Sequence, residues 1–408
     1  MRLLIIGFSN SIHVVRWISQ IADQGWDIHL FPSEDLGITH PDLKAVTVHH
    51  SVYSKGKDLG PGVRLCGIRL PHETLAALSR LTLNNRVPHY RLGQLKRLIR
   101  SLKPDIIHSM EMQSGAYLAL EARKACRNSF PPWLVTNWGS DIYVFGRLPE
   151  HEPKIREVLT SCDYYSCECR RDVDLARSFG FEGRIMPVFP NAGGFDMDLV
   201  SRLRQPGPSS ERRLIMLKGY QGWAGRALVG LRALERCADL LSGCRVAIYS
   251  ASPEMEIAAK LFTRATGVET IIIPKGTPHN EMLSLHGESR VSIGLSIGDA
   301  LSTSFLEAFV MGAFPIQSFT SGAGEWIEHG KTGMLVPPED PEVVEQAVRI
   351  AMTGNRLVDQ ASEMNYLSAR EKLDCRKIKS MAIEMYRSIM TGSTPAKDGQ
   401  QASSRIES

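Results

Sequence analysis

The segment of residues 289–338 constrains the fold more than any other part of the chain. It opens with Val291, Ile293 and Leu295 alternating with small or polar residues, a period of two that predicts a β-strand. A polar turn, a short apolar helix over residues 305–311 and a second extended stretch follow. A strand, a helix and a further strand in this order form one unit of a parallel α/β sheet. In such sheets ligands bind at the carboxyl ends of the strands.

The turn before that helix, which contains Ser302, Thr303 and Ser304, has the chemistry of an anion site. The first backbone N–H groups of a helix have no intrahelical acceptor, and the helix dipole adds partial positive charge there. Asp299 and Glu307 lie on either side and can accept hydrogen bonds from sugar hydroxyls. Ser304 and Glu307 also fit a capping box, in which Glu307 only bonds the first amide of the helix. The spacing alone leaves both interpretations open.

The order of residues around this turn resembles the signature of retaining glycosyltransferases of family 4. Asp299 and Glu307 stand in the two acidic positions of that signature, although Glu is usual at the first. The match continues through Ala308, Gly312, Pro315, Gly322, Glu325, the turn from Gly330 to Gly333, and residues 335–338. The resemblance implies an α/β protein of GT-B architecture, with two doubly wound Rossmann-like domains facing each other across a cleft.

The length of the chain, 408 residues, suits two domains better than a single core. Residues 204–212, rich in Pro, Gly and Ser, have the composition of a linker. We predict an N-terminal acceptor-binding domain over 1–203 and a C-terminal nucleotide-sugar-binding domain over 213–375. A terminal helix over 376–390 is expected to return to the N-terminal domain, and a polar tail over 391–408 to be disordered.

Strand and helix patterns alternate through both halves. In the first half, strand patterns occupy residues 2–6, 26–31, 105–108, 133–136 and 164–167. In the second half, they occupy residues 214–217, 245–249, 270–273, 291–295 and 314–317. Residues 32–88, rich in Gly, His and Pro, show no pattern that assigns their elements.

Composition and charge exclude several classes of protein. No stretch approaches the 18 apolar residues of a membrane span, and the N-terminal residues indicate a strand rather than a signal peptide. The eight cysteines form no CxxC pair, and Cys167 and Cys169 fit packing in a strand better than metal binding. We therefore expect a cytoplasmic protein, with a peripheral position at the inner face of the membrane as the second option.

Residues 80–103 contain seven Arg or Lys residues and no acidic residue. Leucines recur at helical spacing within this stretch, which predicts a basic amphipathic helix. A solvated helix face is one interpretation. The functional one is contact with an anionic membrane surface or a phosphorylated lipid acceptor. No recognised module supports a nucleic-acid partner.

By resemblance, the Gly-rich turn after the strand at 214–217 holds the donor diphosphate. Lys218 and Arg226 supply cations, and Gly219 permits close approach of the backbone. The usual family spacing of these cations is absent, so a flexible loop with solvated cations is the alternative. Lys275 follows a strand at the edge that receives the nucleotide base. The remaining donor-binding residues are predicted to be Leu301, Ser302, Thr303, Ser304 and Glu307.

The segment around Trp138 resembles the family segment in which a His faces the donor sugar. Trp cannot act as an acid or a base. A retaining enzyme of this kind is thought not to need one, because the leaving phosphate can take the proton of the acceptor. The predicted catalytic set is Trp138, Asp141, Asp299 and Glu307, with a purely structural turn as the alternative role of Asp141.

Acceptor-binding residues are expected after the first strand and after the strand at 105–108. They are Ser9, Asn10, Ser11, His13, His108 and Glu111. Ser11 equally fits a helix cap, and a lone histidine such as His108 is more often structural.

The resulting prediction is a retaining glycosyltransferase that moves a sugar from a nucleotide-diphosphate donor to a hydroxyl acceptor. The expected acceptor is a glycan or a lipid-linked glycan, in cell-surface polysaccharide or lipid-linked glycan synthesis. No metal and no cofactor are expected beyond the nucleotide sugar, which is a co-substrate. Two alternatives stay open: a nucleotide-sugar epimerase of the same architecture, and a non-catalytic protein that binds a nucleotide or a glycan.

Overall fold

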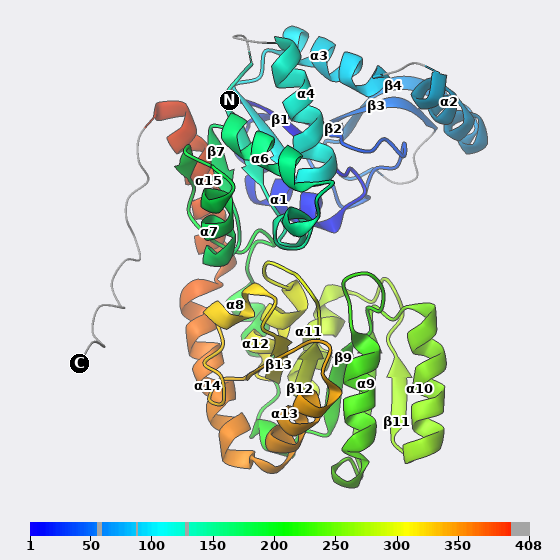
Figure 1. Cartoon of the computed structure of the whole chain (residues 1–408), viewed down its shortest axis with the longest axis vertical. Helices are drawn as coiled ribbons and strands as arrows, with labels where there is room; N and C mark the ends of the chain where they lie inside the picture. The colour runs from blue at the N-terminus through cyan, green and yellow to red at the C-terminus, as the bar shows by residue number, and fades with distance from the viewer. Residues whose placement is uncertain (55–58, 87–88, 127–129, 393–408) are drawn as a thin grey trace.

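The computed structural model of the chain contains two parallel β-sheets, which lie one above the other in Figure 1. It describes residues 1–54, 59–86, 89–126 and 130–392. Most of the tail predicted over 391–408 lies outside the described residues, whereas Thr391 ends the last helix. All strand pairs in the described part of the chain are parallel.

The N-terminal sheet has the strand order β4-β3-β2-β1-β5-β6-β7-β8. Its strands are β1 (Arg2–Gly7), β2 (Asp27–Pro32), β3 (Thr47–Ser54), β4 (Arg64–Leu70), β5 (Ile106–Met110), β6 (Trp133–Thr136), β7 (Tyr164–Ser166) and β8 (Arg184–Ile185). Its helices are α1 (Ile12–Ile21), α2 (Glu73–Arg86), α3 (Tyr90–Leu102), α4 (Tyr117–Cys126), α5 (Ser140–Tyr143), α6 (Glu152–Ser161) and α7 (Arg170–Ser178).

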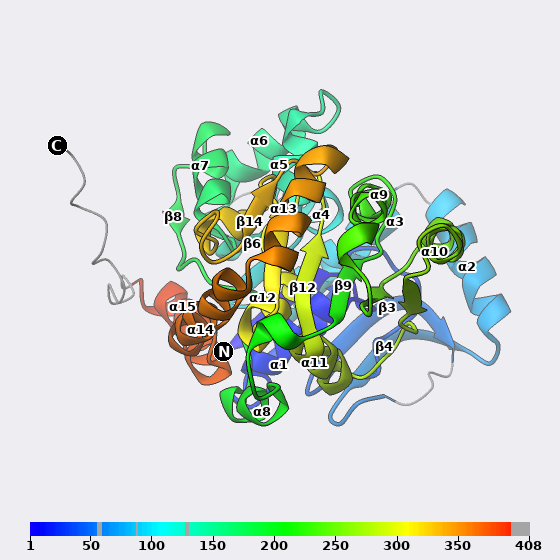
Figure 2. The same ribbon diagram turned by 90° about the horizontal axis from the view of Figure 1, so that it is seen from below.

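The C-terminal sheet has the strand order β11-β10-β9-β12-β13-β14. Its strands are β9 (Leu214–Lys218), β10 (Arg245–Tyr249), β11 (Glu269–Ile272), β12 (Ser289–Gly294), β13 (Phe314–Ser318) and β14 (Met334–Val336). The helices of this half are α8 (Met197–Leu203), α9 (Ala227–Arg236), α10 (Pro253–Thr266), α11 (His279–Glu288), α12 (Thr303–Met311), α13 (Pro341–Thr353) and α14 (Asn355–Lys372). Seen from below, α9, α10 and α13 lie on one side of β9 and β12, and α8 and α11 lie on the other (Figure 2).

Strand β12 and helix α12 show why residues 289–338 form a buried unit. All residues of β12 are buried, because helices cover both faces of a parallel sheet. Helix α12 is buried from Phe305 to Met311. It ends at Gly312, whose φ of 84° is the left-handed conformation that glycine adopts at little cost.

The strand order reverses beside β1 in the first sheet and beside β9 in the second. Connections on the two sides of such a point run over opposite faces of the sheet, which leaves a crevice at the carboxyl ends of the strands. The loops after β1 and β5 therefore form one candidate wall of a site. The loops after β9 and β12 form the other.

The segment that showed no sequence pattern, residues 32–88, contains β3, β4 and α2. Strand β4 lies at the edge of the sheet and is exposed along most of its length, with Ile68 56% exposed. An exposed edge strand needs no apolar face, so its sequence carries little of the alternation that identifies a strand.

The chain crosses between the halves before the predicted linker. Helix α8 packs on α11 and α12 in the C-terminal half. The segment 204–212 also packs on the C-terminal half. Ser209 Oγ donates to the Gly312 carbonyl at 3.0 Å, and the Ser210 backbone N–H donates to Asp359 Oδ1 at 2.8 Å. The packing therefore favours a crossing between β8 and α8. The domain boundaries predicted from the sequence, with a linker over 204–212, stay a prediction.

The last helix, α15 (Cys375–Thr391), lies beside α1 of the N-terminal half (Figure 1). Its apolar residues, among them Ile378 and Tyr386, belong to the same buried cluster as Trp17. Within the described residues, no helix has the length and apolarity to cross a membrane.

Candidate active site

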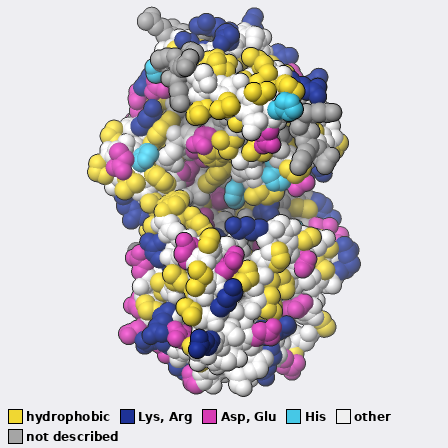
Figure 3. All heavy atoms as spheres, turned by 90° about the vertical axis from the view of Figure 1, so that its right-hand side faces the viewer, with side chains coloured by type: hydrophobic (Ala, Val, Ile, Leu, Met, Phe, Trp, Pro, Cys, Tyr) yellow, Lys and Arg dark blue, Asp and Glu magenta, His cyan; other side chains and the backbone are white. Residues whose placement is uncertain are grey.

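A cavity of about 900 Å³ lies between the two halves. His13 and Trp138 line it from the N-terminal half, and Lys218, Asp299 and Glu307 line it from the C-terminal half. In a space-filling view, cationic, acidic and His side chains come to the surface in the hollow between the halves (Figure 3). The cavity therefore lies at the carboxyl edges of both sheets, where the crevices were expected.

Lys218 and the Ser302 turn meet because β9 and β12 are neighbours in the sheet. Lys218 Nζ donates to Ser302 Oγ at 3.1 Å and lies 3.7 Å from Asp299 Oδ2. Ser302 Oγ is in turn 2.9 Å from Ser304 Oγ. A cation, two hydroxyls and the first amides of α12 thus face the same end of the cavity. This donor set fits a phosphate group.

Glu307 is 6% exposed and does not form the capping box. Ser302 precedes the first residue of α12 and its side chain makes no capping bond, while Glu307 Oε1 bonds His279 Nε2 at 2.9 Å. The capping interpretation was therefore wrong. Burial alone would raise the pKa of Glu307, but the hydrogen bond from His279 and the nearby His286 hold it below its ordinary value. Glu307 is thus a carboxylate at neutral pH, with lone pairs available to ligand hydroxyls.

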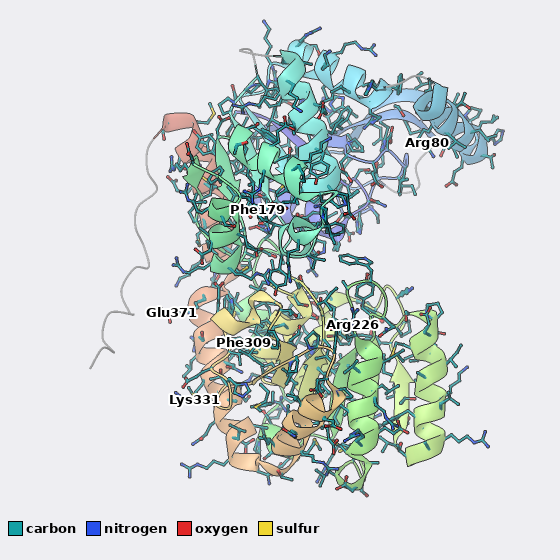
Figure 4. The ribbon with its side chains drawn as sticks, viewed as in Figure 1. Arg80, Phe179, Arg226, Phe309, Lys331 and Glu371 are labelled. Atoms are coloured by element: carbon teal, nitrogen blue, oxygen red, sulfur yellow. The ribbon has the colours of Figure 1, made fainter. Side chains whose placement is uncertain are left out.

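Arg226 turns away from the cavity, although it directly precedes α9 on the side of the gap between the halves (Figure 4). Its Nε donates to Glu339 Oε1 at 2.9 Å, and its Nη1 donates to the carbonyl oxygen of Gly225 at 3.0 Å. Gly219 lies behind Lys218, where an added Cβ would come within 2.6 Å of Ile248. Neither residue lines the cavity, so their donor roles stay predictions. The predicted donor residues that do line it are Lys218, Lys275, Leu301, Ser302, Thr303, Ser304 and Glu307.

Trp138 joins the two halves at the cavity wall. Its ring centroid is 5.1 Å from that of His13, and its carbonyl accepts a hydrogen bond from Ala300 N at 3.4 Å. Gly139, with φ of 102°, allows this approach, because an added Cβ would lie 1.9 Å from Ala300 N. The indole Nε1 is buried and has no partner among the described residues.

Asp141 supports the Trp138 turn rather than the cavity wall. Its carboxylate accepts hydrogen bonds from Trp138 N at 2.9 Å and Met112 N at 3.2 Å. Burial, together with the charge of Asp172, raises the pKa of Asp141 to about 7. This arrangement corresponds to the structural-turn alternative, and contact with a sugar remains untested.

The serines of the first loop are engaged within the protein. Ser9 Oγ donates to the Ile38 carbonyl at 2.6 Å, and Ser11 Oγ accepts a hydrogen bond from His13 N at 3.2 Å as the cap of α1. Asn10 is exposed, but it does not line the cavity. His13, in the first turn of α1, is the one of these four predicted residues that lines the cavity.

His108 and Glu111 are structural in their present contacts. His108 is fully buried, with Nδ1 2.6 Å from Tyr386 Oη and Nε2 2.7 Å from Thr136 Oγ1, and burial lowers its pKa to about 3. Glu111 accepts hydrogen bonds from the amides of Ser114 and Gly115, and burial raises its pKa to about 8. Neither side chain lines the cavity, because both point into the N-terminal core. An acceptor role for either would require a rearrangement.

Several lining residues were missed by the sequence analysis. Among them are Arg16, Glu168, Asn191, Tyr249 and His279. Glu168 and Tyr249 follow or end strands, a position that could have identified them. Arg16 and His279 lie on helices, where sequence gives no sign of which residues face a cleft.

Arg171 also ties the halves together beside the cavity. Its guanidinium donates to the carbonyl oxygens of Thr320 at 2.7 Å and Asp299 at 2.8 Å, and its backbone N–H donates to Glu325 Oε1 at 3.1 Å. No group of three or more potential metal ligands occurs within residues that the structure describes. Independence from metal stays a prediction.

Two family models match the chain and together cover more than half of it. The model described as glycosyl transferase 4-like matches residues 84–164, and the model of glycosyl transferases group 1 matches residues 223–353. No curated protein sequence is significantly similar to the chain.

Solved structures of similar fold cover nearly the whole chain. Sucrose-phosphate synthase from Thermosynechococcus elongatus aligns with a TM-score of 0.66 and 16% identity, over 96% of this chain and 100% of that one. Anabaena HepE, solved in complex with UDP-glucose, aligns with a TM-score of 0.63 and 13% identity, over 95% and 100%. An apo structure of OtsA aligns with a TM-score of 0.65 and 13% identity, over 97% and 100%.

These matches confirm the predicted family, and the structural alignments confirm the predicted GT-B fold. The chain belongs to the group 1, family 4-like glycosyltransferases, and it is a retaining glycosyltransferase that uses a nucleotide sugar.

Proposed function

We propose that the donor diphosphate binds over the Ser302–Ser304 turn and that the sugar is transferred within the cavity between the halves. The observation that carries this proposal is the contact of Lys218 Nζ with Ser302 Oγ at 3.1 Å, at the edge of that cavity. UDP-sugars are the first donors to test, because HepE was solved with UDP-glucose.

Lys218 and the amides of α12 stabilise the negative charge that builds on the leaving diphosphate. Fixed donors of this kind usually provide the largest catalytic contribution, because they need no reorganisation during the reaction. Asp299, 3.7 Å from the Lys218 ammonium, is placed to accept hydrogen bonds from hydroxyls of the donor sugar. Glu307 accepts hydrogen bonds from the ribose hydroxyls, which replace its present contact with His279.

The acceptor binds against the N-terminal wall, which carries His13, Trp138 and Glu168. Retention of configuration requires attack from the face that the diphosphate leaves, so a leaving phosphate oxygen can take the proton of the acceptor hydroxyl. No protein base is needed for that step. Trp138 therefore serves to shape the site and to offer its free indole N–H.

The biological acceptor is proposed to be a lipid-linked or cell-surface glycan. The support is the basic helix α3, on which Arg97, Arg100 and the following Lys103 are exposed. Arg91 does not belong to that surface, because its guanidinium lies 3.9 Å from the centroid of the Phe31 ring, against the body of the domain. An exposed group of basic residues favours attachment to an anionic membrane surface.

Replacing Glu307 tests the site. In a transfer assay with a panel of nucleotide sugars, we expect Glu307→Ala to lower turnover at least about tenfold, since a charge-assisted hydrogen bond contributes about 1.5–3 kcal/mol. Glu328→Ala is the matched control, because Glu328 is exposed and pairs with Lys331 outside the cavity. Wild-type turnover in Glu307→Ala would remove Glu307 from the site. Conversion of the donor without any acceptor would favour the epimerase instead.

A further inference from the structure

Arg16 occupies a position between two cavities. It lies on α1, lines the cavity between the halves, and also lines a second cavity of about 460 Å³. Its guanidinium forms no hydrogen bond or ion pair with any described residue, although it lies within electrostatic reach of Glu307 across the gap. The other two cations of the second cavity are neutralised, Arg376 by Asp374 and Lys379 by Asp23. Among the described cations that line the second cavity, Arg16 is thus the one without an acidic partner, and its charge is available to a ligand.

Asn191 lies on the same wall and is 6% exposed. Its backbone N–H donates to Glu168 Oε1 at 2.7 Å, and its carbonyl accepts a hydrogen bond from Gln20 Nε2 at 3.1 Å. The backbone is therefore fixed, yet neither Nδ2 nor Oδ1 of the side chain has a partner among the described residues. Gln20, which lines the second cavity, is also buried and its Oε1 also has no partner.

Buried polar side chains nearly always have hydrogen-bond partners, so these free amide atoms indicate groups supplied from outside the chain. An amide offers both donors and an acceptor, which suits the hydroxyls of a sugar. A guanidinium offers planar donors that match a phosphate or a carboxylate. The two chemistries stand next to each other on the wall opposite the proposed donor site.

We propose that Arg16 and Asn191 form an acceptor subsite for a sugar that carries an anionic group, a phosphate or a carboxylate. The Asn191 amide contacts sugar hydroxyls, and Arg16 binds the anionic group where the two cavities adjoin. The second cavity then gives room for the part of the acceptor beyond that group. This inference rests on the proposed function, because it takes the N-terminal wall as the acceptor side.

Calorimetry on the full chain, with and without saturating UDP, tests the subsite. The probes are glucose 6-phosphate, glucuronate, glucose and inorganic phosphate. We expect the charged sugars to bind wild type at least about tenfold more tightly than glucose, and the stronger of the two identifies the anionic group. Arg16→Ala should remove the difference between charged and neutral sugars, whereas Lys260→Ala, at an exposed cation on α10, should retain it.

Asn191→Asp provides a second, nearly isosteric variant with a readout that depends on charge. The new carboxylate should weaken binding of both charged sugars at least about tenfold and binding of glucose by less than about threefold, because like charges repel.

Equal affinity of wild type for charged and neutral sugars, or no binding of either charged sugar at millimolar concentration, would overturn the subsite. So would an Arg16→Ala protein that keeps its preference for charged sugars but loses UDP affinity, since Arg16 would then bind the donor diphosphate. Absence of nucleotide binding by wild type, with the sugar results intact, would instead count against the proposed function.

Discussion

The hydroxyl of Tyr386 joins the last helix to the core of the N-terminal half. Trp17 Nε1 donates to it at 2.8 Å, and it lies 2.6 Å from His108 Nδ1. All three side chains are fully buried. Tyr386→Phe keeps the ring and removes only the oxygen, so the change isolates this contact between α15, α1 and β5.

The expected loss of stability follows from Trp17 Nε1 and His108 Nδ1, which both lose their hydrogen-bond partner. Each buried polar group without a partner costs about 1–3 kcal/mol. His108 retains its second contact, to Thr136 Oγ1, so its ring stays in place and its Nδ1 stays without a partner. We therefore expect Tyr386→Phe to lower the free energy of unfolding of the N-terminal half by about 2–6 kcal/mol.

Urea unfolding followed by tryptophan fluorescence measures this loss, since Trp17 is itself one of the two partners. Tyr366→Phe is the control, because the Tyr366 ring lies 4.3 Å from the Arg204 guanidinium and its hydroxyl makes no hydrogen bond to any described residue. The control should change the free energy of unfolding by less than about 0.5 kcal/mol. A loss that small in Tyr386→Phe would refute the buried contact.

Two further predictions concern pH and membranes. Burial lowers the pKa of His108 to about 3, so in acid the unfolded chain binds a proton that the folded chain does not. The stability due to this group is complete above about pH 6.5 and falls toward pH 3, with a slope of up to about 1.4 kcal/mol per pH unit. In urea unfolding at several pH values, the free energy of unfolding should fall less steeply with decreasing pH in His108→Gln than in wild type. Equal slopes would contradict the lowered pKa of the buried His108. In sedimentation with anionic vesicles, replacing Arg97, Arg100 and Lys103 by Gln should weaken binding about a hundredfold, at about 1 kcal/mol per charge; unchanged binding would exclude this surface.

Much of the fold could be predicted because parallel strands covered on both faces leave apolar runs in the sequence. Strand β12 is an example, with every residue buried. Strand β4 could not be predicted, since its edge position leaves Ile68 and its neighbours exposed. The three residues of β14 are too few for a period to show.

The structure brings predicted site residues together where neighbouring strands of a sheet carry them. Lys218 ends β9 and Ser302 lies in the loop after the neighbouring β12, so the topology alone brings them together. The sequence was less informative where a side chain could bond to any of several partners. Arg226 pairs with Glu339, more than a hundred residues away, and His108 turns inward to Tyr386 from the last helix. Those partners are distant in sequence, and no local pattern reveals them.

The central claim is that the Lys218 ammonium and the turn at Ser302 bind the donor diphosphate. Calorimetry with UDP, or with the nucleoside diphosphate that most raises the melting temperature, measures this directly. We predict that Lys218→Ala weakens binding at least about tenfold, whereas Lys331→Ala, at an exposed cation that pairs with Glu328 outside the cavity, changes it by less than about threefold. Unchanged affinity in Lys218→Ala would contradict the account.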